Sequence, residues 1–177
     1  MINGAKIASL VRPSSNLIIV PLDNAKYVIS DTYIMLIMDE EEFTEFFSKY
    51  NSFKSTANIP LNFVGAISKT GDKFESTDVN VLRIIDKVEA AFEEVEITPF
   101  YLKRDKKKEA RIYKVKDMLA IFLRKYDFLL ELGDTYKAAG KIEPLFVCQD
   151  GEVKAIIMPV RYVDDMSLKD KIKELIA

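Results

Sequence analysis

Residues 17–38, with the sequence LIIVPLDNAKYVISDTYIMLIM, decide the fold class of this chain. They contain three apolar runs that are separated only by the polar breaks Asp23-Asn24 and Asp31-Thr32. Breaks of this length and composition suit turns between antiparallel neighbours. The segment therefore predicts three consecutive antiparallel strands, at residues 17–22, 26–30 and 33–38.

The sequence predicts a helix before these strands and another after them. Residues 4–11 (GAKIASLV) predict a short helix that ends before Pro13. Residues 39–53 begin with acidic side chains, which suit the positive end of a helix dipole, and then repeat aromatic side chains at helical spacing. The aromatic side chains are Phe43, Phe46, Phe47, Tyr50 and Phe53. A further amphipathic helix with an acidic outer face is predicted over residues 76–94.

The last third of the chain repeats the element order of the first. A short strand at residues 111–113 precedes a predicted helix at residues 115–125 (VKDMLAIFLRK), whose apolar side chains hold helical spacing. Three strands follow, and Asp150-Gly151 marks a hairpin turn between the last two. These strands are predicted at residues 127–132, 143–148 and 153–162. Residues 167–177 predict a final helix.

The fold class that follows is α+β, with mainly antiparallel sheet, repeated helix-β-β-β units, inserted helices and a C-terminal helix. A length of 177 residues corresponds to about one domain. We expect a single α+β domain over residues 1–166 with an inserted helical section at about residues 39–108. Within that section, residues 58–69 predict an edge strand or an ordered loop, and residues 95–102 predict a strand. Residues 167–177 then form a separate helix.

The composition excludes several kinds of chemistry. The chain has no histidine, so Ser-His-Asp and Cys-His catalysis are excluded. Its one cysteine, Cys148, permits neither an intrachain disulfide nor a thiolate metal cluster, and its apolar surroundings predict a buried, inert thiol. Phosphate-binding loops and dinucleotide motifs are absent. We expect no catalytic residue, no metal site and no cofactor.

Three groups of acidic residues leave one enzymatic alternative open. They lie at residues 39–42, at residues 93–96 and at Asp164-Asp165. A hydrolase that uses divalent metal ions needs carboxylates that converge from separate elements of the fold. The alternative interpretation is that these acids are solvated side chains at helix ends and in loops.

Charge is strongly segregated along the chain, although the net charge is only −2. Residues 103–125 hold ten cations and three acids, a local excess of +7, and residues 72–98 are acidic. A basic surface of this kind can bind the phosphate backbone of duplex DNA. The alternative is a solvated, mobile charge run at residues 103–108 that balances the acidic helix. The candidate phosphate contacts are Lys106, Lys107, Lys108, Arg111, Lys114, Lys116, Arg124 and Lys125.

The chain contains no apolar run long enough to cross a bilayer, and its first residues lack the layout of a signal peptide. We therefore expect a cytoplasmic protein with no membrane partner.

Two regions resemble one known family. Residues 142–162 (IEPLFVCQDGEVKAIIMPVRY) are similar to the final hairpin of bacterial replicative sliding clamps, the DNA polymerase III beta subunit family, which ends in a Met-Pro-Met-Arg-like run. Residues 113–123 resemble the clamp helix before these strands, and residues 127–131 resemble the strand between them. Residues 27–37 are similar to a clamp strand pair, with Ser30-Asp31-Thr32 at its turn. The chain would be a short, divergent relative of the kind that phages or mobile elements encode.

The resemblance implies a fold of β-α-β-β-β units and a role in DNA replication or repair. It implies that Lys114, Lys116, Arg124 and Lys125 lie on or beside a helix that faces duplex DNA without reading its sequence. It also implies that Met158, Pro159, Val160 and Arg161 border a groove for short peptides of polymerases or repair proteins. The alternative for these four residues is a plain edge strand marked by its proline.

Besides the metal-dependent hydrolase, two functional hypotheses therefore remain open. The first is a non-enzymatic, sliding-clamp-like protein that contacts the duplex DNA backbone, docks partner peptides and forms a homo-oligomer. The second is a protein-interaction or assembly module with no nucleic-acid role. In that module the partner surface would be the aromatic face at residues 43–53 or the final helix.

Overall fold

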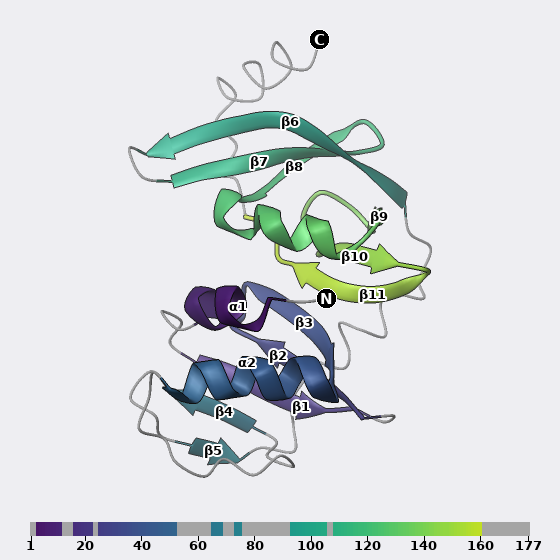
Figure 1. Cartoon of the computed structure of the whole chain (residues 1–177). Helices are drawn as coiled ribbons and strands as arrows, with labels where there is room; N and C mark the ends of the chain where they lie inside the picture. Colours follow the sequence, from purple (N-terminus) through teal and green to yellow (C-terminus); the bar gives the residue numbers. More distant parts are fainter. Residues whose placement is uncertain are drawn as a thin grey trace. The chain divides into compact units, whose positions relative to one another are not determined.

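The computed structural model of the chain describes residues 3–11, 16–22, 25–52, 65–68, 73–75, 93–105 and 108–160. The chain divides into two compact units. Unit 1 consists of Met1–Ala90 with Val153–Ile156, and unit 2 consists of Ala91–Glu152 with Ile157–Ala177. The elements of each unit can be followed by their labels in Figure 1.

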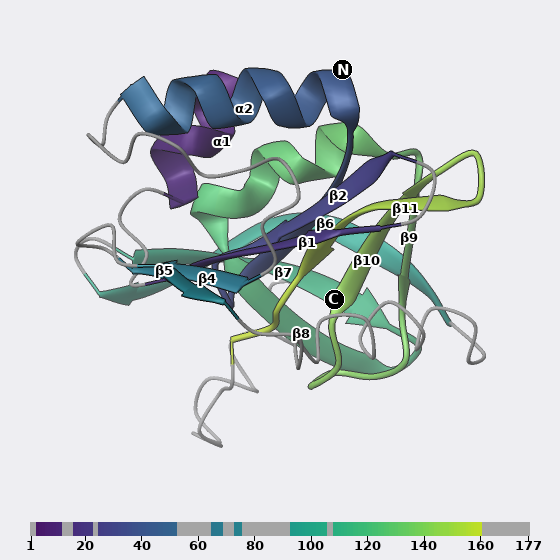
Figure 2. The same cartoon turned by 90° about the horizontal axis from the view of Figure 1, so that it is seen from below.

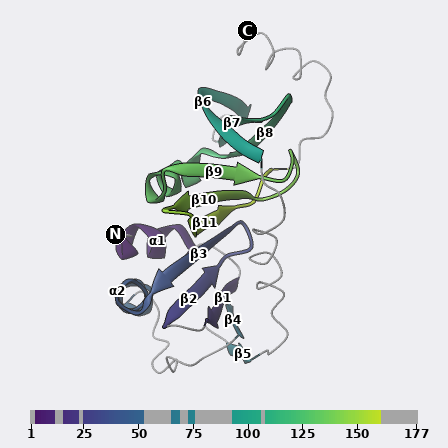
Figure 3. The same cartoon turned by 90° about the vertical axis from the view of Figure 1, so that its right-hand side faces the viewer.

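Unit 1 is built on an antiparallel sheet with the strand order β5-β4-β1-β2-β3-β11 (Figure 3). The pairings β1–β2, β1–β4, β2–β3 and β4–β5 are antiparallel. The strands are β1 (Asn16–Pro21), β2 (Lys26–Ser30), β3 (Ile34–Asp39), β4 (Gly65–Ser68), β5 (Lys73–Glu75) and β11 (Glu152–Ile157). The three consecutive strands predicted within residues 17–38 are therefore confirmed.

Apolar side chains occupy both faces of this sheet. Ile19 of β1 lies opposite Ile29 of β2, and Ile29 lies opposite Leu36 of β3. One position along the strands, Val20 and Val28 form the corresponding pair on the other face. All five side chains are buried. Burial on both faces explains why these strands are nearly continuous apolar runs rather than alternating ones.

Helices α1 (Gly4–Val11) and α2 (Glu40–Ser52) lie on the same side of the unit 1 strands (Figure 2). A Cβ atom built on Gly4 would lie 2.9 Å from the backbone nitrogen of Phe46, so the missing side chain of Gly4 lets the helices approach closely. The ring of Phe43 stacks on that of Tyr27 in β2, with centroids 4.1 Å apart. Phe43, Phe46 and Tyr50 are at most 2% exposed.

This burial corrects the interpretation of the aromatic face as a partner surface. Phe43, Phe46 and Tyr50 pack into the core of unit 1, and Phe47 is half-buried. Phe53 lies outside the described residues. The outward positions of α2 carry Glu41, Glu45 and Lys49 instead.

The strands of unit 2 lie in the order β10-β9-β6-β7-β8, and neighbouring strands pair antiparallel. These strands are β6 (Glu93–Asp105), β7 (Lys108–Val115), β8 (Met118–Leu123), β9 (Thr135–Ala138) and β10 (Leu145–Gln149). A 3-10 helix, η2 (Arg124–Leu132), follows β8 directly. The expected dominance of antiparallel sheet is therefore confirmed in both units.

The predicted helix at residues 115–125 is wrong. Those residues form the end of β7, a two-residue turn at Lys116 and Asp117, and β8. The predicted strand at residues 127–132 is also wrong, because these residues belong to η2. Short apolar runs fit both helical and extended spacing, and here the pairing of β8 with β7 decides between them. Because this helix is not formed, the last third of the chain does not repeat the element order of the first.

The described residues cover several other predictions only in part. The charge run at residues 103–108 is not a loop in its described part, because Lys103, Arg104 and Asp105 end β6 and Lys108 begins β7. The section at residues 39–108 contains α2 and strands as far as it is described. The predicted helices at residues 76–94 and 167–177 lie outside the described residues, apart from Glu93 and Glu94 at the start of β6.

Candidate functional site

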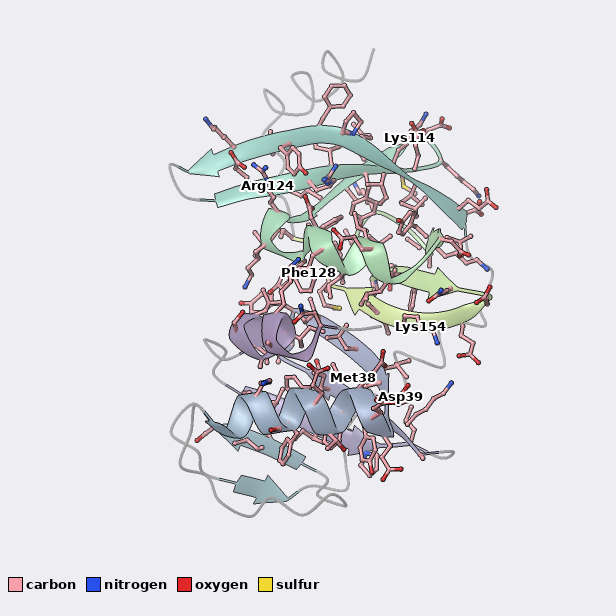
Figure 4. The ribbon with its side chains drawn as sticks, viewed as in Figure 1. Met38, Asp39, Lys114, Arg124, Phe128 and Lys154 are labelled. Carbon is pink, nitrogen blue, oxygen red and sulfur yellow. The ribbon has the colours of Figure 1, made fainter. Side chains whose placement is uncertain are left out.

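The candidate cations of the basic stretch all belong to unit 2. Arg111 and Lys114 lie in β7, Lys116 lies in the β7–β8 turn, and Arg124 and Lys125 begin η2. Lys114 is paired with Leu119 near the start of β8, whereas Arg124 follows the other end of β8 (Figure 4). Lys106 and Lys107 lie outside the described residues, and Lys108 is described by its backbone only.

Arg111 is held by a carboxylate and a backbone carbonyl. Its Nε donates to Asp127 Oδ1 at 3.1 Å and its Nη2 donates to Asp127 Oδ2 at 2.7 Å. Its Nη1 donates to the carbonyl oxygen of Thr98 at 2.9 Å. The hydrogen bonds to Asp127 raise the pKa of Arg111, and both side chains are about four-fifths buried, at 17% and 22% exposure. Arg111 therefore joins β7 to η2 instead of facing a ligand.

Tyr101 of β6 completes this cluster. Its hydroxyl donates to Asp127 Oδ2 at 2.6 Å and accepts from Arg111 Nη2. The guanidinium carbons of Arg111 and Arg124 lie 4.3 and 4.4 Å from the centre of its ring. Burial and the Asp127 carboxylate raise the pKa of Tyr101. We call Tyr101, Arg111, Arg124 and Asp127 the guanidinium cluster.

Four of the other described cations, Lys103, Lys114, Lys116 and Arg124, lie beside acids. Arg124 forms an ion pair with Glu109, and Lys116 Nζ lies 2.5 Å from Glu93 Oε1. Two further pairs of opposite charge face each other across β6 and β7. These pairs are Glu96 with Lys114, and Lys103 with Glu109.

Acidic residues on the neighbouring elements β6 and η2 offset most of the local positive charge. Residues 103–125 carry +7, but the strand and the 3-10 helix that flank them add Glu93, Glu94, Glu96, Asp127 and Glu131. Residues 93–132 hold ten cations and eight acids, a net charge of +2. The sheet region is therefore close to neutral, which weakens the case for a DNA-binding surface.

The proposed peptide-groove residues lie just after β11. Met158, Pro159 and Val160 are half-buried, and Arg161 lies outside the described residues. The side chain of Val160 packs against a buried cluster on β6, β7 and β8, and its backbone N–H donates to the carbonyl oxygen of Ile121 at 2.9 Å. The cluster consists of Leu102, Ala110, Ile112 and Ile121.

A site that sequence reasoning missed lies at the turn between β2 and β3. Asp31 is only 2% exposed, and its Oδ1 accepts the backbone N–H groups of Tyr33 and Ile34, both at 2.9 Å. Ser30 Oγ donates to the carbonyl oxygen of Ile34 at 2.8 Å and accepts the N–H of Thr32 at 3.2 Å. These four hydrogen bonds fix the backbone of the turn.

The same turn combines backbone strain with an exposed aromatic ring. Thr32 has a φ of 75°, which is rare for a β-branched residue. Tyr33, next to it, is 56% exposed although it is large and partly apolar. The turn pair Asp31-Thr32 is visible in the sequence, but Tyr33 belongs to the predicted strand at residues 33–38, and the alternation of that run gives no sign of its exposure.

The described residues offer little to metal or thiol chemistry. They contain no group of three or more Cys, Asp or Glu side chains that could hold a metal ion. Cys148 is buried in β10, as predicted, and burial raises the pKa of its thiol. Asp164 and Asp165 lie outside the described residues. Among the helices in the described part of the chain, none is long and apolar enough to span a membrane.

Comparison with known proteins identifies no relative of this chain: no family model, no curated protein and no solved structure matches it.

Proposed function

We propose that the chain is a non-enzymatic protein-interaction module that docks its partner through Tyr33 at the β2–β3 turn. The observation that carries this proposal is the exposed ring of Tyr33 on a turn held by the buried carboxylate of Asp31. Tyrosine is among the residues most often found at the energetic centres of protein interfaces. Because the hydrogen bonds already fix this turn, Tyr33 loses less conformational entropy when it binds a partner.

The strain at Thr32 supports the same proposal. A β-branched residue at a positive φ costs about 1–3 kcal/mol, and such residues gather at binding and active sites. Glycine or asparagine would form the turn without this cost. The turn therefore has a shape that its sequence does not favour, which is expected where the shape serves recognition.

The experiment is quantitative affinity capture from the cells that make the chain. Tyr33→Ala should lower the affinity for the captured partner about 30-fold, which is the loss expected when a typical hot-spot residue is truncated. The matched control is Ile142→Ala, because Ile142 is another large apolar side chain with high exposure, 64%. Both variants should keep the parent melting temperature, since surface substitutions change stability by about 0.5 kcal/mol or less. Equal capture by Tyr33→Ala and parent would refute the proposal.

A second candidate is a clamp-like protein that contacts duplex DNA. The observation in its favour is that Lys116 and Arg124 remain 61% and 54% exposed although each has an acidic partner. Exposed ion pairs are weak, so a phosphate backbone could compete for these cations. The peptide groove at Met158–Arg161 belongs to this candidate.

A titration of fluorescent duplex DNA at about 50 and 200 mM salt separates the two candidates, because phosphate contacts give a steep salt dependence. The interaction module predicts no binding at either salt concentration. Salt-sensitive binding that disappears when Lys114, Lys116, Arg124 and Lys125 become glutamate would establish the DNA contact instead.

A further inference from the structure

Strand β8 is the last strand in the order of the unit 2 sheet. Its residues Leu119, Ile121 and Leu123 lie opposite Lys114, Ile112 and Ala110 of β7. The carbonyl oxygen of Ile121 accepts a hydrogen bond from Val160, so it points away from β7. Alternate residues of an antiparallel strand direct their backbone groups to the same edge. Leu119 and Leu123 therefore present their N–H and C=O groups on the side of β8 away from β7.

The residues after β11 cross this edge at its centre. Val160 donates its N–H to Ile121 and places its side chain on the cluster of Leu102, Ala110, Ile112 and Ile121. Pro159, the residue before it, has no N–H to offer to another strand. Proteins commonly protect exposed sheet edges with a proline or a covering segment, because bare edges pair with other chains.

We propose that Met158, Pro159 and Val160 guard the edge of β8 against pairing with β8 of a second copy of this chain. This inference goes beyond the proposed function and holds whichever partner the Tyr33 turn binds. The guard acts by occupying the Ile121 carbonyl, which is the central acceptor of the edge.

Charge complementarity identifies the second copy as the occupant. In an antiparallel β8–β8 pair centred on Ile121, Leu119 of one copy faces Leu123 of the other. Asp117 of each copy then lies at the same end of the pair as Lys125 of the other, and both of these residues are exposed. The two-fold symmetry of such a pair repeats this contact, giving two pairs of opposite charge.

The test is the oligomeric state of Val160→Pro, which removes the N–H donor, measured by size exclusion with light scattering from about 5 to 200 µM. The parent chain should show no dimer through this edge, and Val160→Pro should form a dimer. Val160→Ala keeps the N–H and is the matched control, expected to behave as the parent does. Adding Asp117→Lys to Val160→Pro should weaken the dimer at least 10-fold, and adding Lys125→Asp as well should restore it.

A second variant, Val160→Asp, removes the segment from the apolar cluster without a proline and keeps the test decisive if Val160→Pro does not fold. A folded Val160→Pro or Val160→Asp chain that stays monomeric to 200 µM would overturn the proposal. So would a dimer of either variant that the charge exchange does not affect. A parent dimer that Asp117→Lys dissociates would show that the edge is unguarded.

Discussion

At the scale of single residues, Tyr113 shows how an unsatisfied polar group affects stability. Its side chain is fully buried against Phe122, and its hydroxyl has no hydrogen-bond partner in the described part of the chain. A buried hydroxyl without a partner costs about 1–3 kcal/mol relative to a solvated one. We expect Tyr113→Phe to leave the free energy of unfolding unchanged or to raise it by about 1 kcal/mol, measured by urea unfolding at pH 7. A loss above 1 kcal/mol would show that the hydroxyl is bonded.

The same side chain predicts how stability depends on alkaline pH. Burial raises the pKa of Tyr113, whereas an unfolded tyrosine ionises near pH 10. Above pH 10 the unfolded chain loses a Tyr113 proton that the folded chain keeps, so the contribution of Tyr113 to stability is constant below that pH and falls above it. The loss due to Tyr113 is about 1.4 kcal/mol per pH unit. Urea unfolding of Tyr113→Phe at pH 9 and 11 should show a smaller decrease than the parent; equal decreases would contradict the assignment.

Gly133 is required for a different reason, which is lack of space. A Cβ atom built at this position would collide with the carbonyl oxygen of Cys148, which accepts the N–H of Asp134 at 2.9 Å. Gly133→Ala should therefore destabilise the chain by about 1–3 kcal/mol in a denaturant series. Gly140→Ala is the control, because a Cβ there has no neighbour within 4 Å. Similar losses in both variants would rule out the steric explanation.

At the scale of elements, α2 depends on the residue before it. Asp39 Oδ1 accepts the N–H of Glu42 at 2.8 Å, and Glu42 Oε2 accepts the N–H of Asp39 at 3.4 Å, a reciprocal cap of the helix start. Asp39→Ala should lower the free energy of unfolding by about 0.5–2 kcal/mol. Glu41→Ala changes an exposed acid of the same turn and should cost less. Thermal unfolding followed by circular dichroism compares the two, and equal shifts would deny a capping role.

The attachment of η2 to its sheet depends on Asp127. This carboxylate receives two hydrogen bonds from Arg111 and one from Tyr101. Asp127→Asn removes the charge and should destabilise the chain by about 1.5–3 kcal/mol. It should also lower the pKa of Tyr101, because the carboxylate raises that pKa. Ultraviolet titration of the tyrosines measures this shift, and an unchanged titration would contradict the contact.

Elements with a single periodicity were predictable from the sequence, and ambiguous ones were not. The helix at residues 4–11 and the strand at residues 26–30 were predicted to the residue. The prediction for residues 115–125 was wrong because the apolar side chains of this run also fit helical spacing. In addition, the Lys116-Asp117 turn contains no glycine that would indicate a turn, although Lys116 has a φ of 51°. Strand β9, a short run of mixed polarity, gave no signal at all.

The candidate site was harder to predict than the fold. The +7 excess was counted along the sequence, whereas its neutralising acids come from the start of β6 and from η2. The exposure of Tyr33 could not be predicted from the sequence, because it depends on the hydrogen bonds by which the buried Asp31 carboxylate fixes the backbone of the turn. Both features depend on contacts between residues that a window of sequence does not bring together.

At the scale of the whole molecule, the paired charges predict the electrostatic response of the chain. Changing Lys114, Lys116, Arg124 and Lys125 to glutamate alters the net charge by −8, from −2 to −10. The new carboxylates would face Glu93, Glu96 and Glu109. The variant should therefore melt several degrees below the parent at about 20 mM salt and recover at about 500 mM, because salt screens repulsion. A salt-independent melting temperature would show that these cations are not paired.

The reaction of the buried Cys148 thiol with a reagent can be used to measure local opening of the fold. This thiol is the only sulfhydryl group in the sequence, and it lies on β10 in the interior of unit 2. A thiol reagent can modify it only when that part of the sheet opens, so the labelling rate measures the frequency of opening in the unmodified protein. Comparing this rate between parent, Gly133→Ala and Asp127→Asn would follow local opening of unit 2 without an added probe.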